Sequence, residues 1–460
     1  MNRAQVQAIV LAAGMGTRMK SKVPKVLHTL GGKPLLWHVL HTLTEAGINR
    51  RAIVVGHGAE QVQARFPEEE HWFNQTQRLG TAHAVMMAGD FLASAQGYVF
   101  ILCGDAPLIR PQTLMGMLDL AKARGRGVVL AAKVDNPQGY GRMIRSSDGL
   151  LERIVEEKDA SPKERKVQEI NAGVYCLPPQ MLLGALSQVG NNNSQGEYYL
   201  TDIVEILAKE GNQLAIYTTD DQNETLGVNS RKQLAELEAI LRQRKLTELM
   251  ESGVTVVDPA STFVARNVKV GQDTVLLPFT FLEGETTVGE DCRVGPNTRI
   301  VDSALGDGSH CQYSVILESV LEEGVQVGPF AYLRPGTQVK KGAKVGDFVE
   351  LKKSVVGPGS KVPHLSYIGD TQIGAGVNIG AGTITCNYDG IKKHQTVIAD
   401  GAFIGSNTNL VAPIRVGKGA VVGAGSTLTE DVPEGGLALA RARQVNLQKR
   451  EKKMNRQENE

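Results

Sequence analysis

The sequence feature that most constrains the fold is a six-residue repeat that begins near residue 254. Its clearest stretch places an aliphatic residue at every sixth position without a break: Ile398, Ile404, Leu410, Val416, Val422 and Leu428. Such a repeat fits a triangular parallel β-helix in which three hexads make one coil. The aliphatic side chains then point inward and stack from coil to coil, while glycine and other small residues form the corners. A flexible glycine-rich linker would not keep the aliphatic residues in phase.

The first half of the chain has a different pattern, in which apolar strands alternate with amphipathic helices. Strands are expected at AIVLAA, RAIVV, YVFILC and GVVLAAKV, with helical spacing of the apolar residues between them. This alternation predicts a Rossmann-like α/β domain with a mostly parallel sheet covered on both faces. We assign residues 1–229 to this domain, 230–253 to a linker helix, 254–444 to the β-helix, and 445–460 to a charged tail expected to be disordered.

Composition excludes several classes of function. The 50 Lys and Arg residues nearly balance the 49 Asp and Glu residues, and aromatic residues make up only 5% of the chain, so nucleic-acid binding is not expected. No apolar stretch is long enough for a signal peptide or a membrane span. The five cysteines are scattered and include no CxxC pair, which predicts neither a zinc site nor a disulfide framework. We therefore expect a cytoplasmic protein without membrane insertion.

The first candidate site is a glycine-containing loop after the first predicted strand. In VQAIVLAAGMGTRM, Gly14 and Gly16 would let backbone N–H groups approach a phosphate. Met19 stands where a dinucleotide-binding fingerprint would have its third glycine. Arg18 and Lys25 place two cations just beyond the loop, which favours an anionic ligand over an ordinary tight turn.

Asp105 is the second element of this candidate site. It follows the apolar strand YVFILC, at the edge where ligands of open α/β sheets gather. A carboxylate in that place, facing a triphosphate, is suited to hold Mg²⁺. The alternative is an aspartate that only opens a turn before Pro107.

Between about residues 330 and 396, polar residues break the six-residue repeat. The segments FAYLRPGT, FVELKKS and VPHLSYIGD contain Arg334, Glu350, Lys352, His364 and Tyr367. The segment CNYDGIKKHQT then interrupts the repeat with a polar loop. A lone histidine is more often packed or solvated than catalytic, but His364 lies among cations that suit a phosphate, and a base of near-neutral pKa can accept a proton. A second site on the β-helix is therefore predicted.

Nine short segments occur in order and carry a family resemblance: LAAGMGTRM, VPKVL, LGTAHAV, GDAPL, GYGR, VEEKD, EINAG, GEYYLTD and GVNS. They resemble the sugar-phosphate nucleotidyltransferases. With the β-helix motifs, the chain as far as about Arg443 resembles the bacterial bifunctional N-acetylglucosamine-1-phosphate uridyltransferase/glucosamine-1-phosphate acetyltransferases. The resemblance implies a left-handed β-helix and a homotrimer. It also implies acetylation of glucosamine-1-phosphate by acetyl-CoA, followed by UMP transfer from UTP, giving UDP-N-acetylglucosamine for peptidoglycan and lipopolysaccharide synthesis.

The resemblance also implies roles for residues of the first domain. The implied contacts of UTP and UDP-N-acetylglucosamine are Leu11, Ala12, Ala13, Gly14, Lys25, Gly104, Asp105 and Asn229, with Gln75, Gly80 and Thr81 at the uracil and Gly141, Glu156 and Asn171 at the sugar. Arg18 and Lys25 would assist the transfer itself. Asp105 and Asn229 would hold Mg²⁺.

On the β-helix the resemblance implies that His364 is the general base that takes a proton from the amino group of glucosamine-1-phosphate. Glu350 would orient this base or stabilise its charge. The implied contacts are Arg334, Lys352, Tyr367 and Asn378 for glucosamine-1-phosphate, and Ala381, Asn387, Tyr388, Ser406, Ala424 and Arg441 for acetyl-CoA. The alternative left open is a single-activity sugar-1-phosphate nucleotidyltransferase whose β-helix only regulates the enzyme or forms trimers.

Overall fold

The computed structural model describes residues 6–448. By its internal contacts the chain divides into two compact units, Met1–Gln243 and Arg244–Glu460. Most of the charged tail predicted at 445–460 lies outside the described residues.

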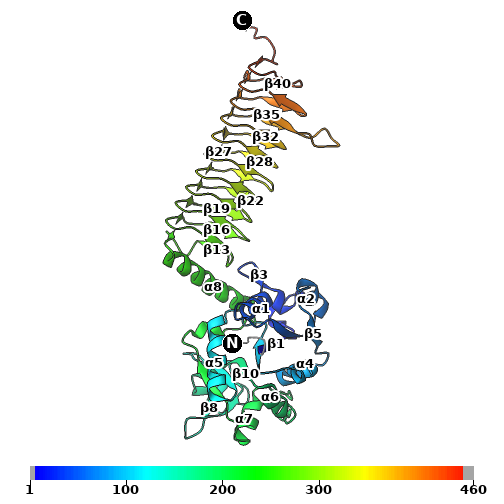
Figure 1. Cartoon of the computed structure of the whole chain (residues 1–460), viewed down its shortest axis with the longest axis vertical. Helices are drawn as coiled ribbons and strands as arrows, with labels where there is room; N and C mark the ends of the chain where they lie inside the picture. Colours follow the sequence, from blue (N-terminus) through cyan, green and yellow to red (C-terminus); the bar gives the residue numbers. More distant parts are fainter. Residues whose placement is uncertain (1–5, 449–460) are drawn as a thin grey trace, which may run out of the picture. The chain divides into compact units, whose positions relative to one another are not determined.

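The sheet of the N-terminal unit has nine strands and is mostly parallel, which confirms the predicted fold class (Figure 1). Its main strands, in spatial order, are β11 (Ala215–Thr218), β7 (Val128–Lys133), β10 (Glu169–Leu177), β6 (Tyr98–Cys103), β1 (Val6–Ala12), β4 (Arg50–Val55) and β5 (His71–Asn74). The strand β10 is antiparallel to both of its neighbours, and β8 (Arg142–Arg145) and β9 (Leu151–Val155) form a hairpin beside it. The strands β1, β4, β5 and β6 are parallel, so their carboxyl ends share one edge.

Helices cover both faces of this sheet because alternate residues of each strand face opposite sides. In β1, Ala8 and Val10 belong to one buried cluster and Ile9 to the other. The helices α1 (Leu35–Glu45), α2 (Ala59–Arg65) and α5 (Pro111–Arg124) contribute to the first cluster, and α3 (Thr81–Met87), α4 (Gly89–Ala93), α6 (Pro179–Leu186) and α7 (Asp202–Lys209) to the second. The short strands β2 (Thr29–Leu30) and β3 (Lys33–Pro34) form a separate hairpin.

The helix α8 (Arg231–Glu251) contributes to the core of each unit in turn. Leu237 packs in a small cluster of the N-terminal unit with Met19 and Leu30, and Leu246 belongs to the core of the second unit. Met19 is 1% exposed. The residue that replaces the third fingerprint glycine is therefore an apolar anchor, which fixes the end of the glycine loop in the core.

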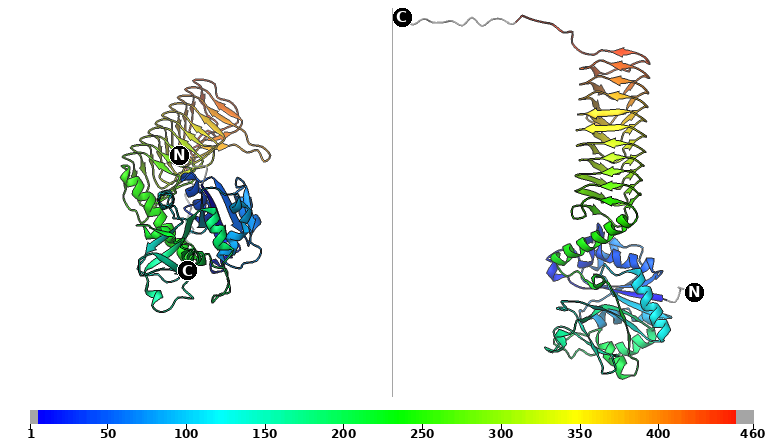
Figure 2. Two further views of the ribbon diagram at one scale, coloured as in Figure 1. Left: turned by 60° about the horizontal axis from the view of Figure 1, so that its bottom comes forward. Right: turned by 90° about the vertical axis from the view of Figure 1, so that its left-hand side faces the viewer.

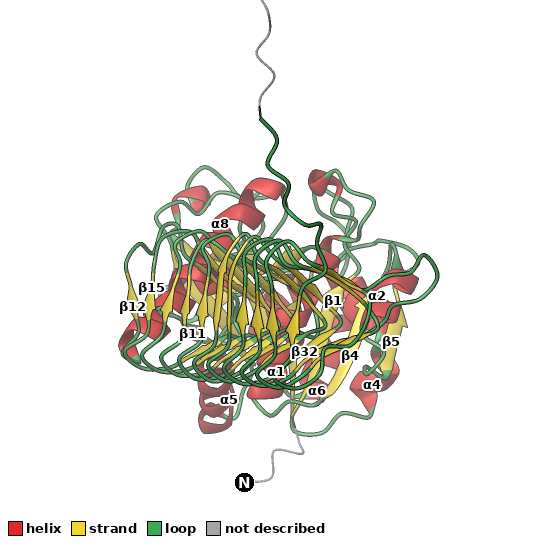
Figure 3. Ribbon diagram, turned by 90° about the horizontal axis from the view of Figure 1, so that it is seen from above, coloured by secondary structure: helices red, strands yellow, loops and turns green. Residues whose placement is uncertain are grey.

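The second unit consists of three parallel sheets of 11, 10 and 9 short strands, which begin with β12 (Thr255–Val256), β13 (Phe263–Val264) and β14 (Lys269–Val270). Ile398 pairs with Val416 and Ile404 with Val422, so one coil spans eighteen residues, or three hexads. All six aliphatic residues of the predicted run are buried. Figure 2 and Figure 3 show the strands of successive coils stacked on one another, consistent with the predicted left-handed β-helix.

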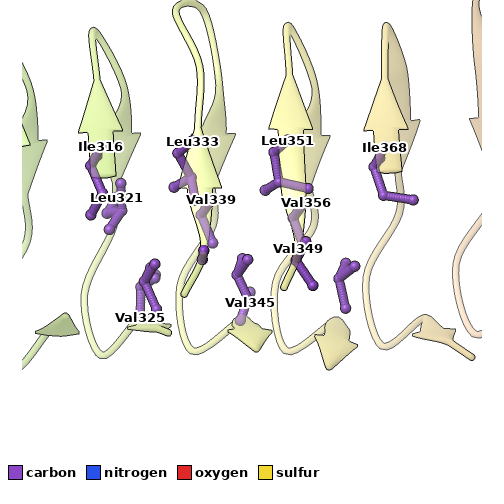
Figure 4. Packing of buried hydrophobic residues seen from close by; sticks show 14 of the residues in the cluster. Ile316, Leu321, Val325, Leu333, Val339, Val345, Val349, Leu351, Val356 and Ile368 are labelled. Atoms are coloured by element: carbon purple, nitrogen blue, oxygen red, sulfur yellow. The ribbon is translucent and has the colours of Figure 1, made fainter. Parts of the chain in front are cut away.

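Inward-pointing aliphatic side chains form the core of the β-helix (Figure 4). Leu333, Leu351 and Ile368 occupy the same position in successive coils, and Val339 stacks on Val356 in the same way. All five are buried, so each coil seals the apolar surface of the next.

The strands that carry the second candidate site have the following bounds: β25 (Tyr332–Leu333), β27 (Lys344–Asp347), β28 (Glu350–Lys352), β30 (Lys361–His364), β31 (Tyr367–Gly369), β33 (Asn378–Ile379), β34 (Ile384–Cys386), β35 (Thr396–Ile398), β36 (Phe403–Ile404), β39 (Val421–Val422) and β41 (Leu437–Ala438). The coils differ in length. Leu351 and Ile368 are paired seventeen residues apart, whereas Ile373 and Ile398 are paired twenty-five apart. The longer coil holds the predicted polar loop, which projects from the stack near β35 (Figure 1).

The valines of β39 test the coil-stacking core. Val422 is 1% exposed and Val421 is 41% exposed. We expect Val422→Ala to lower the free energy of unfolding of the β-helix by about 2 kcal/mol, because it removes buried methyl groups and leaves a cavity. Val421→Ala is the matched control and should change it little. Chemical denaturation followed by circular dichroism measures the free energy of unfolding of both variants. Equal losses in the two would contradict the assignment of Val422 to the core and of Val421 to the surface.

Candidate functional site

Two adjoining cavities of about 390 and 240 Å³ lie at the carboxyl edge of the parallel strands in the N-terminal unit. Leu11, Thr81, Cys103 and Asp105 line both of them. The smaller cavity is also lined by the predicted residues Ala12, Ala13, Gly14, Lys25, Gln75 and Gly80, and the larger one by Arg18, Gly141, Glu156, Asn171 and Asn229. Gly104 does not line either cavity, but its N–H donates to the Leu11 carbonyl at 2.9 Å. The predicted sugar positions thus line the larger cavity, and the predicted uracil positions Gln75 and Gly80 line the smaller one, while Thr81 lines both.

Lys25 joins two of the predicted metal-binding oxygens. Its ammonium group donates to the Asp105 carboxylate and, at 3.1 Å, to Oδ1 of Asn229. All three side chains reach one point from distant segments: Lys25 follows the glycine loop, Asp105 follows β6, and Asn229 precedes α8. Three distant segments of the sequence therefore together form a site that suits a cation.

The same donor set fits Mg²⁺. A carboxylate oxygen and an amide oxygen meet where the Lys25 ammonium lies, and Mg²⁺ commonly takes one or two protein oxygens and completes its shell with water and substrate phosphates. Among residues 6–448, no group of three or more His, Cys, Asp or Glu side chains could hold a metal ion. A metal at this place would therefore depend on oxygens of the substrate.

The larger cavity has amide and carboxylate groups suited to sugar hydroxyls. Glu156 accepts a hydrogen bond from the Thr201 hydroxyl at 3.2 Å, and burial is the main cause that raises the pKa of its carboxyl. Asn171 donates to the Tyr175 hydroxyl at 2.9 Å. Gly141 packs so closely that a Cβ there would lie 2.9 Å from Ile154 Cγ2. A glycine at this position lets the backbone approach Glu156.

The smaller cavity has a preformed amide site at Gln75. Its side chain is buried, donates to the Gly80 carbonyl at 3.0 Å and lies 3.0 Å from Nδ1 of His83. Gly80 has a φ of +115°, and a Cβ there would lie 2.3 Å from the Tyr198 carbonyl oxygen, so only glycine fits. Sequence reasoning missed His83 and Tyr198, although both lie within quoted motifs.

Cys103 lines both cavities but is not a candidate nucleophile. Burial raises the pKa of its thiol to about 12, with repulsion from Asp105 as the second cause. The thiol is therefore neutral at physiological pH, and a neutral thiol is a poor nucleophile.

On the β-helix, His364 has a carboxylate partner that the sequence did not identify. His364 Nδ1 lies 2.5 Å from Oδ1 of Asp347, because the ends of β27 and β30 are in register. The hydrogen bond to His364 is the main cause that lowers the pKa of Asp347. Glu350, which we expected to orient the base or stabilise its charge, accepts a hydrogen bond from Arg334 at 2.9 Å.

Two lysines of the second candidate site stand close together. Lys352 is buried, its Nζ is 3.5 Å from Oδ2 of Asp370, and its contact with Lys393 lowers the pKa of Lys393. Asn387 also donates to Asp370, at 2.5 Å. Sequence reasoning missed Lys393, which belongs to the inserted loop; the only signal was its place in CNYDGIKKHQT. Two ammonium groups held together in this way are suited to a dianionic phosphate.

The residues predicted for acetyl-CoA follow His364 along the stack. Ala381, Ser406 and Ala424 come just after β33, β36 and β39, which are neighbouring strands of one sheet. Arg441 follows β41 of the same sheet and donates to the Ala424 carbonyl at 2.8 Å. These positions form a column of corners on successive coils. Tyr388 is exposed, and its hydroxyl donates to the Gly390 carbonyl within the inserted loop.

Within the described part of the chain, no helix has the length and apolar character required to cross a membrane.

Comparison with known proteins assigns both units to families. The nucleotidyl transferase family model matches residues 7–226, and the bacterial transferase hexapeptide (six repeats) model matches residues 395–430. Three curated relatives, each called bifunctional protein GlmU, match nearly end to end. The relative from Heliobacterium modesticaldum is 52% identical, over 95% of both chains. The relative from Geobacillus sp. is 50% identical, over 95% of this chain and 96% of its own. The relative from Carboxydothermus hydrogenoformans is also 50% identical, over 96% of this chain and 99% of its own. The chain belongs to the bifunctional GlmU family, whose members join a nucleotidyltransferase unit to a hexapeptide-repeat unit.

Proposed function

We infer that the chain is a bifunctional enzyme that makes UDP-N-acetylglucosamine in two steps. The β-helix acetylates glucosamine-1-phosphate with acetyl-CoA, and the N-terminal unit transfers UMP from UTP to the product and releases pyrophosphate. The observation that carries this function is the pairing of His364 with Asp347, in a unit separate from the Lys25–Asp105–Asn229 cluster. An enzyme with only nucleotidyltransferase activity would not need this second cluster, which disfavours the single-activity alternative.

For uridylyl transfer, the residues position two substrates and stabilise negative charge. An oxygen of the sugar phosphate attacks the α-phosphorus of UTP, an O–P bond forms, and the bond to the β-phosphate breaks so that pyrophosphate leaves. The attacking oxygen is already anionic, so no general base is required. Arg18 and Lys25 are placed to neutralise the phosphates, and Asp105 and Asn229 would hold Mg²⁺. When bound, Mg²⁺ would supply further neutralisation of the triphosphate.

For acetyl transfer, Asp347 fixes the form of His364 that can act as a base. A carboxylate at Nδ1 keeps the proton on that nitrogen and leaves the lone pair on Nε2 free to accept a proton from the amino group of glucosamine-1-phosphate. The amine attacks the thioester carbonyl, a C–N bond forms, the C–S bond breaks, and coenzyme A leaves. Asp347 would also stabilise the imidazolium. Lys352 and Lys393 are suited to bind the phosphate of the amino sugar.

An exposed apolar ladder supports the proposed homotrimer. Tyr313, Phe330, Phe348 and Leu365 occupy the same corner in successive coils; the first two ring pairs are 5.6 and 5.3 Å apart, and the last three side chains are more than half exposed. Exposed apolar patches of this kind favour burial against another chain. Leu365 directly follows His364, so a second copy on this ladder would lie beside the base. The acetyltransferase site would then be completed between subunits.

The proposed metal site makes uridylyl transfer sensitive to Asp105. Asp105→Asn should lower the uridylyl transfer rate at least 10²-fold, because it removes a charged ligand of Mg²⁺, while acetyl transfer stays near the wild-type rate. Rates measured against Mg²⁺ concentration check this, with Asp148→Asn in an exposed turn as the control. An unchanged Mg²⁺ dependence would show that Asp105 does not hold the metal.

The proposed pairing of the general base His364 with Asp347 makes acetyl transfer sensitive to Asp347. His364→Ala should abolish acetyl transfer, and Asp347→Asn should lower its kcat on the order of 10²-fold, because the imidazole loses its orienting carboxylate. Glu323→Gln, which removes the carboxylate of the Lys341 ion pair, is the matched control. Thiol release from acetyl-CoA gives the rates, and circular dichroism checks that the β-helix of each variant is folded. Wild-type acetyl transfer in Asp347→Asn would refute the orienting role.

The apolar ladder makes the oligomer sensitive to a charge at its centre. Phe330→Asp should convert trimers to monomers at micromolar concentration and lower acetyl transfer with them, because a carboxylate would be buried without a partner. Sedimentation velocity measures the mass, with Leu150→Asp on the exposed surface of the other unit as the control. A trimer that survives Phe330→Asp would place the interface elsewhere.

A further inference from the structure

The rim of the larger cavity in the N-terminal unit is a loop that is hydrogen-bonded to a buried guanidinium on the side away from the cavity. The loop residues Gln138, Gly139, Tyr140 and Gly141 all line the cavity. The next residue, Arg142, begins β8 and does not line it; its side chain is 2% exposed. A cation is rarely buried to this degree unless it has partners.

The partners of Arg142 are the loop itself, one carboxylate and, at 3.5 Å, the carbonyl of Arg165. Arg142 Nη1 donates to the Tyr140 carbonyl, and Arg142 Nη2 donates to Oε2 of Glu157 at 2.6 Å. The same Glu157 oxygen accepts the Gly139 N–H at 3.2 Å. These two hydrogen bonds, with that from Arg142 first, lower the pKa of Glu157, so the carboxylate stays ionised. One ion pair therefore holds two peptide groups of the rim, one on either side of the Gly139–Tyr140 peptide.

The neighbouring residue of the same motif faces the other way. Glu156 lines the cavity and accepts the Thr201 hydroxyl, whereas Glu157 is bonded to the loop. Gly141 lies next to Glu156, because a Cβ there would be in ordinary van der Waals contact with Oε1 of Glu156, at 3.5 Å. The Gly141 carbonyl also accepts the Asn171 N–H at 2.9 Å. The clamped loop thus sets the distance between the cavity rim and the groups proposed to bind the sugar.

We propose that Arg142 and Glu157 are positioning residues that set the affinity for the acceptor, an N-acetylhexosamine-1-phosphate, without touching it. This rests on the proposed uridylyl transfer. Residues 138–141 contain two glycines and would be mobile without the clamp, so each binding event would have to order them. The clamped residues line only the larger cavity, whereas the predicted uracil contacts Gln75 and Gly80 line the smaller one. The clamp therefore acts on the larger cavity, where the acceptor is proposed to bind, and not on Gln75 and Gly80 at the uracil.

The test uses two variants. Glu157→Gln keeps the shape of the side chain and removes its charge. Arg142→Lys keeps the positive charge but cannot donate from two nitrogens as the guanidinium does. Each should raise KM for N-acetylglucosamine-1-phosphate about tenfold, the loss expected for one charge-assisted hydrogen bond. KM for UTP and the acetyl transfer rate should stay at wild-type values. Arg145→Gln is the matched control, because Arg145 lies on β8 like Arg142 but forms an exposed ion pair, with Glu169.

Hydrogen exchange separates positioning from simple loss of structure. In both clamp variants the amides of residues 138–141 should exchange faster, with no change at β6 or β10, even if the melting temperature falls. Equal rises of KM for both substrates, or an unchanged acceptor KM with faster exchange, would overturn the positioning role. Absence of uridylyl transfer in the wild-type chain would instead refute the proposed function, so the two failures are distinguishable.

Discussion

Parallel strand pairing places the carboxyl ends of neighbouring strands along one edge, and in both units the functional groups lie on such an edge. In the N-terminal unit the ends of β1 and β6 bring the glycine loop next to Asp105. In the β-helix the ends of β27 and β30 bring Asp347 next to His364. The two units share no strand order, yet the same backbone constraint lets short segments far apart in the sequence supply one site.

Much of this arrangement could be predicted because it depends on periodicity and on local motifs. Strict hexads can be satisfied only by stacked coils, so the buried positions of the β-helix followed from spacing alone. The glycine loop, Lys25 and Asp105 were each weak signals that became informative together. Met19 shows the limit of a fingerprint: its side chain is an anchor in the core, a role that comparison with a glycine pattern does not reveal.

The partners across coils could not be predicted, because they depend on coil length. Eighteen residues before His364 stands Gly346; the coil is one residue shorter, which brings Asp347 opposite the histidine instead. Lys393 reaches Lys352 only because an insertion lengthens its coil. A coil shortens where the step between inward aliphatic residues falls from six to five, as between Leu351 and Val356, and lengthens at the inserted loop, so the regular six-residue pattern alone does not give these pairings.

One short segment of the N-terminal unit connects the two cavities. The Tyr198 N–H donates to the Leu79 carbonyl, the Leu200 N–H donates to the Thr81 hydroxyl, and the Thr201 hydroxyl donates to Glu156. The walls proposed for uracil and for sugar thus share a single mechanical support. A ligand that draws residues 198–201 toward one cavity must alter the other wall as well, so nucleotide and acceptor need not bind independently. The backbone of residues 198–201 would then determine the order in which the two substrates bind and the cooperativity between them.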